Sequence, residues 1–353
     1  MARQARGEVF DPLEVSTWHC INRCVRRCFL CGHDPVSGKN FDHRKQWLEA
    51  RFRWLAANFG IDVLGFAILS NHFHLVMRNR PDVVATWSDE EVARRWLYLC
   101  PLRKTESGQP EEPTDAEMRS ITGVASRLTE IRHRLSDISW FMRMVAEPVA
   151  RQANAEEDIH GRFWQGRFRS VKLCDESALL ACSVYVDLNP LRAGLAESPE
   201  TSDFTSAQRR IAALQQSASA ASDDTHPEHI RPDAWLAPLP LAEGSTKPGP
   251  AASVSRPRCS DKGFLPMSVV EYLELLDWTG RQIVAGKRGA IPEALPPILT
   301  RLGIATPGWL ELASNFGRLY HRVAGGCSAV QRERTRRTSR PFRCRHARLL
   351  GSG

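Results

Sequence analysis

Two histidines separated by one residue, His72 and His74, are the first candidates for chemistry in this sequence. They follow the apolar run IDVLGFAIL and a Ser70-Asn71 pair, a pattern typical of a β-hairpin whose second strand is HFHLVMR. On a strand, residues two apart point to the same side, so both imidazoles can face one metal ion. The alternative is a pair of ordinary polar residues on an exposed strand face, which the His-x-His pattern alone does not exclude.

A tyrosine and an asparagine further along the chain form a second candidate pair. Asp175 is a predicted N-cap, and the helix that it opens is expected to run to about Leu188 before Pro190 stops it. Tyr185 and Asn189 are four residues apart and so share one face near the end of this helix. Taken alone, a tyrosine on a helix is usually a half-buried packing residue, so its role depends on context.

The segment FWQGRFRSVKL mixes aromatic and basic residues in a strand-like alternation. Trp164 could stack on a base, Gly166 permits close backbone approach, and three cations, Arg167, Arg169 and Lys172, could contact phosphates. The alternative is an amphipathic edge strand with a solvated basic face. This segment therefore suggests nucleic-acid binding without requiring it.

Four segments in fixed order, WHCINR, NHFHLV, FWQGRF and YVDLNPLRAG, cover about residues 15–195. Together they resemble the REP-associated tyrosine transposases, which belong to the single-tyrosine transposase family of the HUH endonuclease superfamily. The resemblance implies an α+β fold, a ferredoxin-like antiparallel sheet with helices on one face. It also implies that the histidines lie on a central strand and the tyrosine on a helix packed across the sheet.

The resemblance assigns a role to each candidate. His72 and His74 would bind Mg²⁺ or Mn²⁺ with Asn189 completing the coordination, and the amide oxygen suits either hard cation. Insertion-sequence members of the family have a glutamine at the position of Asn189. Tyr185 would attack a DNA phosphodiester, giving a 5′-phosphotyrosine and a free 3′-OH that allow strand transfer without ATP. Because metal-bound imidazole must be neutral, activity is expected to fall below about pH 6.

The expected partner is single-stranded or hairpin DNA, and a homodimer is possible. By their positions in the family motifs, Asn22, Arg23 and Arg192 are further candidates for phosphate contact. The function predicted is a metal-dependent single-stranded DNA endonuclease and strand transferase. The main alternative is a catalytically inactive DNA-binding protein with the same fold.

Four cysteines near the N-terminus raise a different possibility. Cys24, Cys28 and Cys31 have the spacing of the cluster-binding loop in radical-SAM enzymes, although no glycine-rich SAM-binding segment accompanies them. A structural zinc site that also uses Cys20 or His33 is a second option, and ordinary thiols a third. A metal- or cluster-binding enzyme therefore stays open as a less favoured alternative.

Composition and segment boundaries complete the prediction. The 353 residues carry 48 Lys and Arg against 40 Asp and Glu, a net charge of +8 that makes a polyanionic partner worth testing. No apolar run is long enough to span a membrane and no signal peptide is evident, so a cytoplasmic protein is expected.

Residues 1–212 are the predicted catalytic domain, with an insertion at about 98–135. An Ala/Ser/Pro-rich linker (213–262), a small helical module (263–330) and a disordered Arg-rich tail (331–353) are expected to follow.

Overall fold

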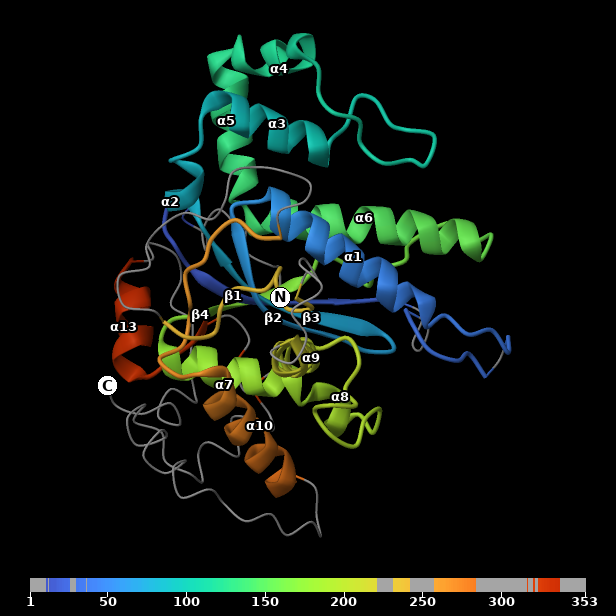
Figure 1. Ribbon diagram of the computed structural model, residues 1–353, viewed down its shortest axis with the longest axis vertical. Helices are drawn as coiled ribbons and strands as arrows, with labels where there is room; N and C mark the ends of the chain where they lie inside the picture. Colours follow the sequence, from blue (N-terminus) through green and yellow to red (C-terminus); the bar gives the residue numbers. More distant parts are fainter. Residues whose placement is uncertain are drawn as a thin grey trace.

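A five-stranded sheet with the strand order β2-β3-β1-β4-β5 forms the centre of the molecule (Figure 1). The computed structural model describes residues 11, 13–25, 30–35, 37–220, 231–241, 257–283, 316, 320 and 323–336. Strands β1 (Thr17–Arg23), β2 (Ile61–Ile68), β3 (His72–Asn79) and β4 (Arg169–Leu173) pair antiparallel, and β5 (Val323–Ala324) adds to β4 in parallel. The mixed α+β class with a mostly antiparallel sheet confirms the predicted fold class.

Helices cover both faces of this sheet, whereas the sequence predicted them on one face. Helices α1 (His43–Asn58) and α6 (Ile138–Glu156) pack on one side, where Phe73 and Leu75 of β3 join their apolar residues in the larger core cluster. Helix α7 (Glu176–Asp187) covers the other side and shares a second cluster with Val76. The sheet is therefore buried from both sides, and α7 lies below it in Figure 1.

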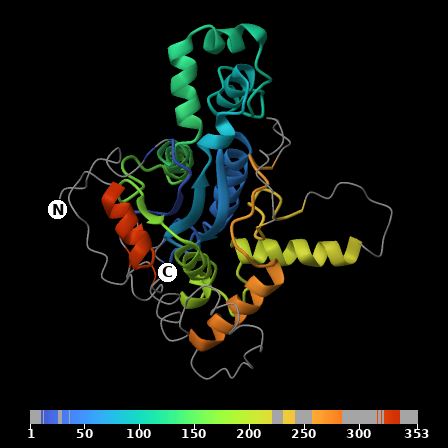
Figure 2. The ribbon, with the colours of Figure 1, turned by 90° about the vertical axis from the view of Figure 1, so that its left-hand side faces the viewer.

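Helix α7 begins where the sequence predicted it. The Asp175 side chain accepts a hydrogen bond from the backbone N–H of Ala178 at 2.8 Å, which satisfies an otherwise unpaired donor of the first turn. The helix is apolar on nearly all sides, as expected of a helix enclosed by other elements. Its outer side is covered by α10 (Val269–Ile283), which crosses it in Figures 1 and 2. Pro190 sits in the first turn of the short helix α8 (Asn189–Arg192), which follows directly.

A lobe of four short helices separates β3 from α6. It comprises α2 (Pro81–Val84), α3 (Asp89–Leu99), α4 (Asp115–Thr122) and α5 (Ala125–Leu135), and it projects at the top of Figures 1 and 2. Its helices pack mainly on one another and on α1, beginning before the expected insertion at 98–135. Within the described part of the chain, no helix combines the length and apolar character needed to cross a membrane.

Parts of the segment expected to be a linker pack against the sheet. Helix α9 (Ser206–Ala220) crosses the expected boundary at 212, Trp235 is 3% exposed in the larger core cluster, and the Ala237 N–H donates to the Val63 carbonyl of β2. The other described elements near the C-terminus are β5 and helix α13 (Cys327–Arg336), which enters the expected tail. The second predicted helix of the module, PPILTRLGI, and the rest of the tail fall outside the described residues.

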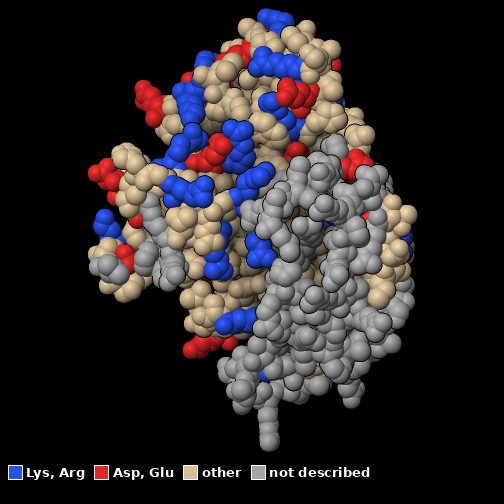
Figure 3. All heavy atoms as spheres, turned by 180° about the vertical axis from the view of Figure 1, so that it is seen from behind, with Lys and Arg blue, Asp and Glu red and all other residues tan. Residues whose placement is uncertain are grey.

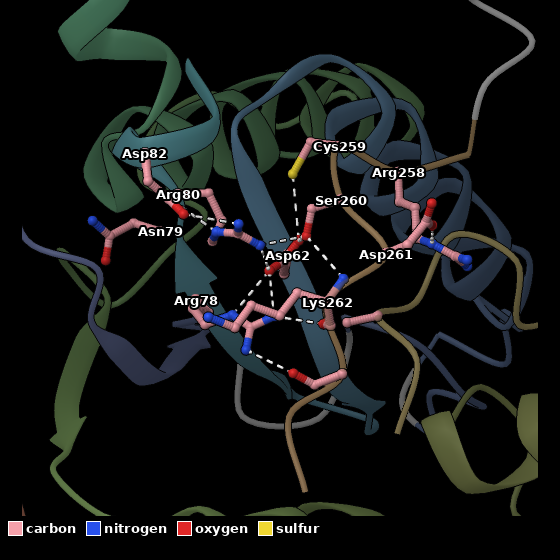
Figure 4. Close-up of polar contacts among 12 residues, drawn as sticks. Asp62, Arg78, Asn79, Arg80, Asp82, Arg258, Cys259, Ser260, Asp261 and Lys262 are labelled. Carbon is pink, nitrogen blue, oxygen red and sulfur yellow. Dashed lines mark hydrogen bonds and ion pairs between the residues drawn. The ribbon is translucent and has the colours of Figure 1, made fainter. Parts of the chain in front are cut away.

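A buried ion-pair cluster attaches residues 259–263 to the β2–β3 hairpin (Figure 4). The carboxylate of Asp62 contacts the guanidinium groups of both Arg78 and Arg80, at 2.7 and 3.1 Å. Ser260 donates to the same carboxylate at 2.8 Å, and Arg78 donates to the carbonyls of Lys262 and Gly263. Because these charges are desolvated, the cluster requires all its partners to be in place. It therefore fixes residues 259–263 on the β2–β3 hairpin.

Candidate functional site

The two predicted histidines lie at the start of β3, in the interior of the sheet, with β2 on one side and β1 on the other. His72 pairs with Arg23 and His74 with Ile21 in the register of β1. Their rings lie on the face covered by α7, with centroids 4.9 Å apart and nearly perpendicular planes. The alternation of the strand thus places both imidazoles together, as the His-x-His pattern requires.

Helix α7 brings Tyr185 over the histidines. The Tyr185 and His74 ring centroids are 5.6 Å apart, with an interplanar angle of 83°. Asn189, one helical turn later, lies with its amide nitrogen 3.4 Å from Nε2 of His74 and also hydrogen-bonds to Tyr185. His74 and Tyr185, which are 111 positions apart in the sequence, therefore come together within one copy of the chain.

A third histidine, His19 of β1, belongs to the same cluster and was missed in the sequence. Its Nε2 lies 2.9 Å from Nδ1 of His74, and the two rings stack with centroids 5.1 Å apart. His19 is fully buried, and its ring is also 5.9 Å from that of Tyr185. The signal was present in WHCINR, since His19 shares a strand face with Ile21 and Arg23. Only the pairing of β1 with β3 reveals its importance.

Burial keeps the three imidazoles neutral. Desolvation is the main cause that lowers the pKa of His72 to about 4 and that of His19 to about 3, and nearby arginines add to it. The pKa of His74 is also well below its usual value, mainly through burial. Burial raises the pKa of Tyr185, against the opposing effects of the Asn189 hydrogen bond and the Arg192 charge. The resting cluster is therefore neutral imidazoles beside a neutral phenol.

Arg192 places a buried cation beside the tyrosine. Its guanidinium carbon lies 5.2 Å from the centre of the Tyr185 ring. All three guanidinium nitrogens are buried and lack a hydrogen-bond partner among the described residues. Burial lowers the pKa of Arg192 to about 10, which leaves it charged at neutral pH. A buried, unsatisfied guanidinium is costly, and an anion with several oxygens would satisfy it.

The other predicted DNA-contacting residues divide between the two faces. Arg23 and Arg169 are exposed and lie close enough to the cluster to lower the pKa of His72 and His19, respectively. Asn22, Trp164 and Arg167 instead line a cavity on the opposite face, beside α6.

Two of the predicted DNA contacts are buried in structural roles. Trp164 is 8% exposed, packs against Phe73 and donates from Nε1 to the Ala146 carbonyl at 2.8 Å. Lys172 is 6% exposed, and its Nζ lies 3.1 Å from Glu14 and 3.0 Å from Glu333. The Lys172 ammonium is neutralised by two carboxylates, so the structure does not bring it to the histidine cluster.

The donor set at the histidines fits a hard divalent cation. Nδ1 of His72 donates to Oδ1 of Asn71 at 2.6 Å, which leaves the lone pair of the neutral ring on Nε2. Nε2 of His74 faces Asn189, whose amide oxygen would replace the nitrogen after a flip of the side chain. Two imidazole nitrogens and an amide oxygen are therefore available. A group of three or more His, Cys, Asp or Glu side chains able to hold a metal is absent from the described residues.

The N-terminal cysteines in the described residues are buried. Cys20, Cys24 and Cys31 are each at most 1% exposed, and burial raises the pKa of Cys31 to about 12, which disfavours the thiolate that metals bind. Cys28 lies outside the described residues. Ordinary buried thiols fit these three positions.

Comparisons with known proteins add one distant structural match. No family model matches the sequence, and no curated protein matches it. Among solved structures, the chain is similar to a REP-associated tyrosine transposase bound to a REP hairpin, with a TM-score of 0.36 and 13% identity. The match covers 60% of this chain and 86% of that one.

Proposed function

We propose that this protein is a transposase-like endonuclease that cleaves single-stranded DNA through Tyr185 and transfers the strand. The observation that carries the proposal is the convergence of Tyr185, His74 and Asn189 within a few ångströms. The unsatisfied guanidinium of Arg192 beside the phenol supports it, because a phosphodiester provides the oxygens that this group lacks. The net charge of +8 suits a polyanionic substrate.

The chain's own residues define most of the reaction. Arg192 would hold a non-bridging oxygen of the scissile phosphate and neutralise charge that grows as the phosphorus is attacked. The Tyr185 oxygen would form a bond to phosphorus while the bond from phosphorus to the 3′ oxygen breaks. The phenol loses its proton to solvent and the 3′ oxygen takes one up. The products are a 5′-phosphotyrosine and a 3′-OH, and a second 3′-OH can reverse the step on another strand.

A divalent cation is part of this proposal. Nε2 of His72, Nε2 of His74 and the amide oxygen of Asn189 would hold Mg²⁺ or Mn²⁺. Bound there, the cation would supply Lewis-acid stabilisation of the phosphate and favour the phenolate, which the buried site otherwise disfavours.

The surface near the site is suited to a nucleic-acid backbone. Arg23 and Arg169 are exposed beside the histidines. Seen from behind, Lys and Arg side chains run through the middle of the described surface, with fewer Asp and Glu among them (Figure 3). Arg23 and Arg169 would hold the strand electrostatically whatever its sequence.

A covalent-adduct assay tests the proposal. Purified protein is incubated with labelled single-stranded hairpin oligonucleotides and Mn²⁺, separated on a denaturing gel, and the shifted peptide is mapped by mass spectrometry. The adduct is expected on Tyr185 among the four tyrosines of the chain. Tyr185→Phe should bind the oligonucleotide and form none, whereas the control Tyr98→Phe, in the helical lobe, should form it normally. Binding by wild type without any adduct would instead identify the inactive DNA-binding protein.

A further inference from the structure

A cavity of about 650 Å³ lies on the sheet face opposite the histidines, between α6 and the segment that precedes β4. Its walls are rich in aromatic rings, including Trp140 and Phe168, which are half-buried and pack against the larger core cluster. The exposed residues Arg143, Arg162 and Arg167 also line it, together with Asp137 and Glu147. Arg143 is paired with Glu147, so Arg162 and Arg167 are the better candidates for a phosphate. Aromatic walls with arginines around them match the two parts of a nucleotide, the flat base and the anionic phosphate.

One polar side chain in the cavity lacks an internal role. Asn22 is 4% exposed, and its side-chain amide makes no hydrogen bond to the described residues. The polar atoms of this amide are not fully buried and line the cavity, where a ligand group can replace water as their partner. An asparagine amide offers a donor and an acceptor side by side, a pattern that the N6 and N7 atoms of adenine complement.

The cavity and the histidine site lie back to back at the same end of the sheet. Asn22 pairs with Phe73, and its neighbour Arg23 pairs with His72, so consecutive residues of β1 face the two sites. A single strand that leaves the histidine face has only the sheet edge to cross before it reaches the cavity.

The edge that such a strand would cross is irregular and basic. Cys24 forms an isolated bridge with Trp164, and Ile21 pairs with Arg169. Between these two pairs lie residues 22–23 on one side and residues 165–168 on the other, so the second segment is two residues longer. The additional residues form a bulge that includes Gly166. Strand β5 pairs only with residues 172 and 173, so among the described residues no strand covers this bulge.

We propose that this cavity binds an unpaired base, preferably adenine, of the same DNA strand whose phosphate is held at Tyr185. The inference rests on the proposed function and extends it, because it gives the protein a way to select a nucleotide beside the cleavage position. The base would stack against Phe168 and lie beside Trp140, whose ring already contacts the guanidinium groups of Arg134 and Arg143. Asn22 would pair with the edge of the base. Arg162 would contact the adjoining phosphate.

Photo-crosslinking tests the location directly. A 12-mer of 8-azidodeoxyadenosine, a photoreactive adenine analogue, is irradiated with the protein in EDTA, and the crosslinked peptides are mapped by mass spectrometry. Crosslinks are expected in the peptides that contain Trp140 and Phe168. Crosslinks confined to other peptides would overturn the assignment of the cavity.

Affinity measurements test the role of the lining residues. Anisotropy titrations with fluorescent dA12 and dT12 are expected to show tighter binding of dA12, and Phe168→Ala should weaken dA12 binding about 10-fold. Asn22→Ala should remove the preference for dA12. Trp47→Ala, which removes a half-buried ring of α1 outside the cavity, is the control and should bind like wild type. Unchanged affinity of the Phe168 variant overturns the proposal, as does equal wild-type binding of dA12 and dT12.

The experiments can contradict the proposed function and the cavity proposal independently of each other. If wild type forms the Tyr185 adduct while its crosslinks map elsewhere, the cavity proposal is wrong and the proposed function stands. If crosslinks map to the cavity but no adduct forms, the protein binds DNA there without cleaving it. Thermal unfolding of each variant confirms that a lost affinity does not reflect a lost fold.

Discussion

His19 Nε2 lies 2.9 Å from His74 Nδ1, so one of these two nitrogens carries the proton that they share in a hydrogen bond. For His74 to present an unprotonated Nε2 toward Asn189, its proton must be on Nδ1 and be donated to His19. His19 then carries its own proton on Nδ1, a buried atom that has no hydrogen-bond partner in the described part of the chain. His19 is thus a positioning residue for His74.

Replacing His19 should weaken metal binding without unfolding the protein. His19→Phe removes the acceptor for the His74 proton, so the dissociation constant for Mn²⁺ is expected to rise 10- to 100-fold. Electron paramagnetic resonance titration measures this constant, and ¹⁵N NMR reports the His74 tautomer. The control is His133→Phe, at an exposed position in α5. A wild-type spectrum with the proton on Nε2 of His74 would contradict the assignment.

Stability should fall as pH falls from about 6.5 to about 4. The unfolded chain protonates its histidines near pH 6.5, whereas burial lowers the pKa of His72 to about 4 in the folded protein. Between these values the unfolded state binds more protons, so stability rises with pH in this window and is lost on acidification. The cost for His72 is about 3 kcal/mol, at ~1.4 kcal/mol per pH unit. Urea unfolding at pH 4.5, 5.5 and 7.0 measures it, and His72→Asn should show a shallower dependence.

The same pKa values change the expected activity profile. The sequence alone predicted loss of activity below about pH 6, but folded imidazoles that stay neutral to about pH 4 can keep their lone pairs available. The initial rate of adduct formation should therefore persist at pH 5.5 if the protein remains folded. A rate that titrates with a midpoint near 6.5 would contradict the burial of these rings.

The sequence predicts much of the site because strand and helix periodicities are local. The alternation around His72 and His74 and the N-cap at Asp175 required only neighbouring residues, and the hairpin and α7 are confirmed. The importance of His19 depends on which strand lies beside β3, and the burial of Lys172 depends on two distant carboxylates. Neither the strand pairing nor the contacts of Lys172 can be predicted from the neighbouring residues in the sequence.

Salt dependence separates the arginines proposed to contact phosphates from Lys172. If Arg23, Arg169, Arg192 and Arg162 each meet a phosphate, the logarithm of the affinity for single-stranded DNA should fall with log salt at a slope of about −3, from ~0.7 per contact. Arg169→Gln should reduce the slope by about 0.7. Lys172→Gln should leave the slope unchanged and destabilise the fold, since it leaves Glu14 and Glu333 without their shared cation. Anisotropy titrations between 50 and 300 mM NaCl measure both slopes.

Asp187 connects α7, the helix that carries Tyr185, to the C-terminal part of the chain. This fully buried carboxylate accepts hydrogen bonds from Ser206 Oγ at 2.5 Å, the Ala207 N–H at 3.0 Å and the Tyr272 hydroxyl at 2.6 Å. Its neighbours two positions away on either side are Tyr185 and Asn189. The carboxylate therefore ties α7, α9 and α10 together directly behind the proposed nucleophile.

Of three variants at this junction, the alanine variant of Asp187 should lose the most stability. Asp187→Ala leaves three donors without an acceptor and should cost about 3 kcal/mol of unfolding free energy, with loss of the Tyr185 adduct. Asp187→Asn keeps an acceptor for Ser206 and Ala207, and the Tyr272 hydroxyl can rotate to accept from its amide. Burial raises the pKa of Asp187, so removing the charge also relieves a desolvation penalty and the asparagine variant should lose less than 1.5 kcal/mol. Tyr272→Phe removes one bond and should cost about 1 kcal/mol. Urea unfolding ranks the variants, and an alanine variant as stable and active as wild type would show that the C-terminal elements do not position α7.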